Sequence, residues 1–157
     1  MRPRWVRSLD DYWSWFSEQL ASCGGQLEND DSLIVQVVED PDTKERVTLV
    51  LGRQRLIFHD GSWLEFSLVV NRDLEVVEYN FHYAASDDRL IWRLDRHRGH
   101  DDMLVHIHLP PDQREPYGEV EIDDVLDKIF EHLNSSPTAT PGQPGRVRRR
   151  SPRRRKT

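Results

Sequence analysis

The spacing of apolar side chains predicts a helix near each end of the chain. Apolar residues recur three or four positions apart over about residues 9–23, which places them on one helical face. This stripe consists of Leu9, Tyr12, Trp13, Phe16 and Leu20. Ser8 and Asp11 have the spacing of a capping box, and two glycines follow the stripe. A second stripe predicts a helix over residues 122–134 and consists of Ile122, Val125, Leu126, Ile129, Phe130 and Leu133. We expect both stripes to pack into a core, although Trp13 and Phe16 could also contact a partner.

Between the two helices the hydrophobic period changes to two, which is typical of half-buried strands. Seven segments show it, over residues 33–40, 45–52, 53–60, 62–70, 74–83, 89–95 and 103–109. Short turn sequences separate them, such as Asp60-Gly61, and short loops favour antiparallel neighbours. The predicted fold class is therefore α+β: an antiparallel β-meander sheet with one face covered by the N- and C-terminal helices.

Side chains alternate across a strand, so residue parity assigns each one to a face of the sheet. The apolar set should face the helices: Leu64, Phe66, Leu68, Val77, Tyr79, Phe81, Tyr83, Leu90, Trp92, Leu94, Val105, Ile107 and Leu109. A polar set should share the uncovered, solvated face: Glu65, His82, Arg93, Asp95, His106 and His108. An ordinary solvated face would also be polar, but three histidines with an arginine and an aspartate favour a site.

This polar set predicts one of two chemistries. Two histidines at positions i and i+2, here His106 and His108, could hold a metal ion with a carboxylate, although no further ligand motif supports such a site. Alternatively, two histidines can cleave RNA without a metal: one takes the proton of the 2′-hydroxyl and the other protonates the leaving oxygen. Arg93 would then stabilise the phosphate charge, and Asp95 would orient a histidine or Arg93. We expect no cofactor, and we do not exclude a metal at His106 and His108.

The strands that carry the polar set also resemble a known family in sequence. Four motifs occur in the order and approximate spacing of TumE-type toxins, over about residues 53–134. They comprise Leu64, Glu65 and Phe66; Tyr79, His82 and Tyr83; Leu90, Ile91, Arg93 and Asp95; and His100, His106, His108 and Leu109. The resemblance implies the toxin of a toxin–antitoxin system, with a cognate antitoxin as partner and RNA as the expected substrate. It adds Glu65, Tyr83 and His100 as accessory residues. Leu94, Arg96 and Ile107 depart from the residues that the family prefers.

The charge of the chain is divided between its two parts. All 28 acidic residues precede residue 135, whereas eight of the 22 basic residues follow it. We therefore expect one domain over residues 1–134 and a disordered basic tail over 135–157 that contacts nucleic acid or serves only to keep the protein in solution. The expected contacts are Arg148, Arg149, Arg150, Arg153, Arg154 and Arg155.

The remaining composition limits the class of protein. The single cysteine excludes an internal disulfide framework, and no stretch approaches the ~18 apolar residues of a membrane span. We expect a cytoplasmic protein without membrane contact. The alternative function is a non-enzymatic interaction module that binds a partner protein through the polar face and nucleic acid through the tail.

Overall fold

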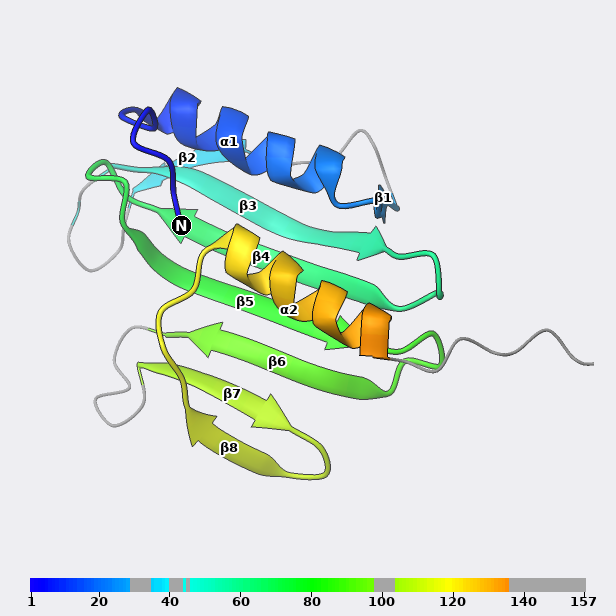
Figure 1. Cartoon of the computed structure of the whole chain (residues 1–157). Helices are drawn as coiled ribbons and strands as arrows, with labels where there is room; N and C mark the ends of the chain where they lie inside the picture. Colours follow the sequence, from blue (N-terminus) through cyan, green and yellow to red (C-terminus); the bar gives the residue numbers. More distant parts are fainter. Residues whose placement is uncertain (29–34, 40–43, 45, 98–103, 136–157) are drawn as a thin grey trace, which may run out of the picture.

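A computed structural model shows one antiparallel sheet with two helices side by side on the same face (Figure 1). The structure describes residues 1–28, 35–39, 44, 46–97 and 104–135. The sheet order is β1-β3-β4-β5-β6-β7-β8, and β2 pairs with β3 beside β1. The elements are α1 (Leu9–Ser22), β1 (Gln26–Leu27), β2 (Val35–Glu39), β3 (Arg46–Ile57), β4 (Trp63–Val70), β5 (Val76–Ala84), β6 (Leu90–Arg96), β7 (Val105–Leu109), β8 (Gln113–Pro116) and α2 (Ile122–Ser135). The predicted α+β class is confirmed.

The first helix begins at the predicted capping box. The Ser8 hydroxyl accepts a hydrogen bond from the Asp11 backbone N–H at 3.1 Å, and the Asp11 carboxylate accepts one from the Ser8 backbone N–H at 3.1 Å. Two backbone donors that the helix itself cannot satisfy are thus paired. The helix buries Tyr12, Trp15, Phe16 and Leu20, so Trp15 joins the predicted stripe.

The second helix covers the middle of the sheet and buries its predicted stripe. Ile122, Val125, Leu126 and Ile129 are buried, and Phe130 and Leu133 pack against the core. In Figure 1, α2 lies in front of β4 and β5, whereas α1 lies nearer β3. Neither helix in the described part of the chain combines the length and apolar character needed to span a membrane.

The predicted strand register is also confirmed. Most of the inward positions predicted for β4 to β7 are buried, among them Leu64, Phe66, Tyr79, Phe81, Trp92, Leu94, Val105 and Ile107. Val77 and Leu90 were predicted wrongly: each lies beside a register shift and is only partly buried, and its neighbour Val76 or Ile91 packs against the core instead. The rings of Phe16 on α1 and Phe66 on β4 have centroids 5.7 Å apart, which places this face against the helices. A shift of one residue would have reversed every side chain, so parity assigned the correct face along β4 to β7 except beside these two register shifts.

Other features of the sheet also differ from the prediction. The two-residue strand β1 was not predicted. The segments 45–52 and 53–60, predicted as two strands, form the single strand β3, with a register shift between Leu51 and Gln54 where it pairs with β4. Such a register shift lets one strand continue at a position where the sequence pattern predicted a break between two strands. Strand β8 was not predicted, because its four residues are all exposed and lack an alternating pattern.

Candidate functional site

The polar face of the sheet carries one straight line of side chains across six strands. Direct cross-strand pairing joins Arg55 to Glu65, Glu65 to His82, His82 to Arg93, Arg93 to His108, and His108 to Arg114. We call these six residues the central row. Directly opposed residues have their Cβ atoms within about 5 Å, so each member is beside the next.

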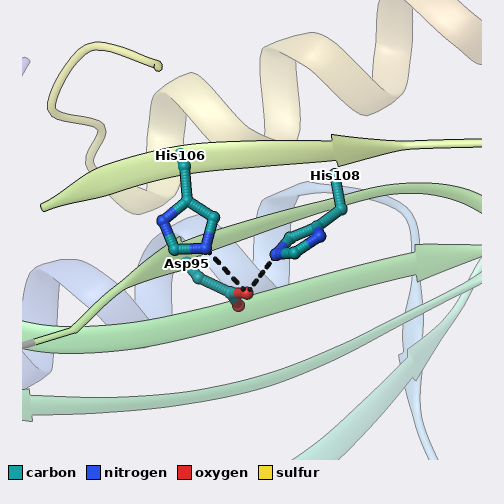
Figure 2. Close-up of side chains that lie close together, drawn as sticks. All are labelled: Asp95, His106 and His108. Atoms are coloured by element: carbon teal, nitrogen blue, oxygen red, sulfur yellow. Dashed lines mark ion pairs between the residues drawn. The ribbon is translucent and has the colours of Figure 1, made fainter. Parts of the chain in front are cut away.

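A second line of residues runs beside the central row, two positions along each strand. It pairs Asn80 on β5 with Asp95 on β6, and Asp95 with His106 on β7. The two lines meet at Asp95, because its neighbours in both lines direct polar atoms towards its carboxylate. Figure 2 shows the imidazole rings of His106 and His108, both from β7, directed at the carboxylate of Asp95 on β6.

Five side chains converge on this one carboxylate. The closest to Oδ2 are Arg93, whose Nε donates a hydrogen bond at 2.8 Å, and His108, whose Nε2 lies 3.1 Å away. The Nε2 atoms of His106 and His97 lie 3.6 Å and 3.9 Å from the same oxygen. The Asn80 amide donates a hydrogen bond to Oδ1. We call this group the Asp95 cluster.

The structure corrects one expectation about this cluster. Asp95 and His106 lie on the predicted face, but they are not solvated: their exposed fractions are 0 % and 3 %. A carboxylate tolerates burial only when hydrogen bonds and opposite charge replace water, and Arg93 and Asn80 provide both. Arg93, His108 and His82 remain partly exposed and form the accessible surface above the buried pair.

The Nε2 atom of His108 contacts two different neighbours. It lies 3.0 Å from Nη2 of Arg93 and 3.1 Å from Oδ2 of Asp95. One ring nitrogen either carries a proton or presents a lone pair, so it donates to Asp95 in one tautomer and accepts from Arg93 in the other. The contacts therefore provide a partner for Nε2 of His108 in either tautomer.

Both partly exposed histidines of the central row have a lowered pKa. Desolvation lowers the pKa of His108, and the positive charge of Arg93 lowers it further, while Asp95 opposes the shift. Desolvation also lowers the pKa of His82, where Glu65 opposes the shift and Arg93 adds to it. Because the ordinary pKa of histidine is about 6.5, both rings are mainly neutral at pH 7.

A metal ion is the other group that this cluster could hold. Asp95, His106 and His108 each offer one ligand atom, and these three atoms lie within 4.8 Å of one another. The guanidinium of Arg93 already contacts two of these residues, with Nε on Asp95 and Nη2 on His108. A divalent ion binding there would meet the positive charge of Arg93, which opposes its binding.

The accessory residues fall in different places. Glu65 lies in the central row, with its carboxylate 3.9 Å from Nη2 of Arg55. Tyr83 does not join the site: it is fully buried on the helix-facing side, against Trp92 with ring centroids 5.3 Å apart, and its hydroxyl hydrogen-bonds to Ser62. His100 lies outside the described residues, as do the tail arginines Arg148, Arg149, Arg150, Arg153, Arg154 and Arg155.

Sequence reasoning missed several members of the polar face. Asn80 has the parity of the polar face, but nothing in the sequence predicted its hydrogen bond to Asp95. His97, at the end of β6, has no strand pattern to place it. Arg114 belongs to the unpredicted strand β8, so its pairing with His108 had no sequence signal. Trp63 fits the outward parity of β4, and it stacks on His82 with ring centroids 5.3 Å apart and an angle of 12° between the ring planes.

Comparison with known proteins gives one match. The model of the family described as Toxin TumE matches residues 26–136, a range that includes every strand of the sheet and all of α2. No curated protein and no solved structure matches the chain significantly.

Proposed function

The chain belongs to the TumE toxin family, and from this premise we propose that it inhibits growth by cleaving RNA at the Asp95 cluster and His82. The family makes it the toxin of a toxin–antitoxin system, with an antitoxin as its partner. The observation that carries the proposal is the line formed by His82, Arg93 and His108. It places one guanidinium between two imidazoles on a partly exposed surface.

In this proposal His108 is the general base. When its Nε2–H donates to Asp95, its lone pair is on Nδ1, which accepts the proton of the RNA 2′-hydroxyl. The carboxylate fixes the tautomer and stabilises the imidazolium that forms, as a buried aspartate does for the histidine of a serine protease. The lowered pKa of His108 keeps the ring neutral at pH 7 and so ready to act as a base.

The other two members of the line complete the reaction. The 2′-oxygen attacks phosphorus, the bond to the 5′-oxygen breaks, and a 2′,3′-cyclic phosphate forms. The protonated form of His82, which is the minor form at pH 7, lies on the opposite side of Arg93 and gives its proton to the leaving 5′-oxygen. Arg93 binds the phosphate and stabilises the charge that develops on it, while Asp95 holds its Nε. His106 is buried and contacts Asp95, so it is a positioning residue.

The central row offers cationic side chains to RNA in spite of the acidic body, although Arg93 pairs with Asp95 and Arg55 lies near Glu28 and Glu65. Arg55, Arg93 and Arg114 occupy three of the six positions in the central row, where Glu65 is the only acidic member. Cations on one face attract phosphate even when the net charge of the protein is negative, because salt screens charges that lie more than about 10 Å away.

Inducible expression tests this proposal. The wild-type gene is induced with and without the gene of its antitoxin, next to His108→Ala and the matched control His59→Ala, whose histidine is exposed in the turn before β4. We expect growth arrest for the wild type and His59→Ala, rescue by the antitoxin, and no arrest for His108→Ala. Circular dichroism establishes that each variant is folded.

Two results would reject the proposal. A folded His108→Ala protein that still arrests growth would show that the histidine is not needed. Growth arrest without a change in cellular RNA would support the non-enzymatic alternative, in which the polar face binds a partner protein.

A further inference from the structure

The central row extends beyond the three proposed reacting groups and carries an arginine at each end. Arg114 on β8 pairs with His108, and Arg55 on β3 pairs with Glu65. Neighbouring strands lie about 4.8 Å apart, so Arg114 and Arg55 are about 10 Å and about 14 Å from Arg93 along the row. The row is therefore longer than a single phosphate requires.

The two ends of the row offer different contacts. Arg114 is exposed, and its charge contributes to the lowered pKa of His108, which places it near that ring. At the other end, the guanidinium carbon of Arg55 lies 4.0 Å from the ring centroid of Trp63, and Trp63 stacks on His82. Arg55, Trp63 and His82 thus form a group of packed planar side chains, which we call the planar stack.

We propose that the central row is the binding track for a single RNA strand that crosses β3 to β8. This inference rests on the cleavage proposed above and names its substrate class. Arg93 holds the reacting phosphate and Arg114 holds the neighbouring phosphate on the His108 side. An unpaired base on the His82 side packs against the planar stack.

A single strand fits this track better than a duplex does. Proteins that bind single strands combine cations along the backbone with planar side chains on which unpaired bases stack. In a duplex the bases are paired inside the helix and cannot reach the planar stack. An unpaired strand should therefore contact Arg93, Arg114 and the planar stack together, whereas an A-form helix should lack the contact with the planar stack.

The experiment measures binding separately from cleavage. Fluorescence anisotropy follows a labelled 2′-O-methyl RNA, which has no 2′-hydroxyl nucleophile, as a single strand and as a duplex of the same sequence. The full-length wild type is compared with Arg114→Ala, Arg55→Ala and the matched control Arg72→Ala, whose arginine is exposed in the turn between β4 and β5. The tail is present in every protein, so its contribution cancels.

We expect the wild type to bind the single strand more tightly than the duplex. Arg114→Ala should bind it about tenfold more weakly, the effect of losing a charged hydrogen bond to phosphate. Arg55→Ala should also bind it about tenfold more weakly, because it removes part of the surface on which the base stacks. Arg114→Ala should also reduce the slope of log affinity against log salt by about 0.7, the value for one phosphate of a single strand. Arg72→Ala should bind like the wild type.

Two results would overturn this inference, and a third would separate it from the proposed function. Equal affinity for duplex and single strand would overturn the track, as would an Arg114→Ala or Arg55→Ala protein that binds as tightly as Arg72→Ala. Tight, arginine-dependent binding by a protein that leaves ordinary RNA intact would support the track and refute the cleavage.

Discussion

Replacing Asp95 by asparagine should cost the protein measurable stability as well as its activity. The change keeps the shape of the side chain but removes the charge that Arg93, His108 and His106 face. Breaking a buried ion pair costs about 3–5 kcal/mol when both charges are buried. Asp95 is fully buried, but the side chain of Arg93 is 37 % exposed, so water replaces part of the lost interaction. We therefore expect a loss of about 2 kcal/mol in the free energy of unfolding.

The assay is thermal and urea unfolding of Asp95→Asn beside Glu65→Gln. A loss of 2 kcal/mol should lower Tm by roughly 8 °C in a protein of this size. Glu65→Gln also removes one carboxylate from the polar face, but its partner Arg55 is 3.9 Å away and both side chains are about a third exposed. Exposed pairs of this kind contribute under about 1 kcal/mol. Equal unfolding energies for the two variants would refute the view that Asp95 organises the site.

Other predictions concern the reacting groups and the tail. Because His108 is partly exposed, His108→Ala should change the unfolding energy by under about 1 kcal/mol in urea titrations while slowing RNA cleavage by ~10²–10⁴-fold. Arg93→Lys should also lose most cleavage, since an ammonium group cannot contact Asp95 and a phosphate in two directions as a guanidinium does. The initial rate should be highest below pH 6.5 and fall through neutral pH, because His82 must be protonated while its pKa is lowered; a rate that rises from pH 6 to 8 would contradict these roles. Deleting residues 135–157 should leave Tm nearly unchanged and weaken RNA binding, and a large drop in Tm would contradict the predicted tail.

Much of the site could be predicted because it depends on local rules. Alternation along β4 to β7 assigns a face to the side chains away from the register shifts, and short turns favour neighbouring strands. From those two facts alone, His82, Arg93 and His108 were expected to share one face, and the structure places them in direct cross-strand pairs. Register follows from which face is apolar, so long as the pattern is unbroken.

The burial of Asp95 and His106 could not be predicted by the same rule. Parity says which way a side chain points, but not whether its neighbours exclude water from it. The burial depends on five polar side chains meeting at one carboxylate, and one of them, His97, lies just beyond the end of β6. Strand β8 was missed for a related reason, because an exposed edge strand has no apolar face to create a pattern.

The most direct test of the central claim is RNA cleavage by the purified toxin in the presence of a strong chelator. We predict that wild-type protein and His59→Ala cleave single-stranded RNA and leave a 2′,3′-cyclic phosphate at the new end, whereas His108→Ala and His82→Ala do not. Cleavage that disappears with the chelator and returns with added metal would contradict the role of Arg93. It would indicate that a metal ion held by Asp95, His106 and His108 supports the reaction instead. An intact RNA substrate after incubation with a protein that arrests growth would contradict the account altogether.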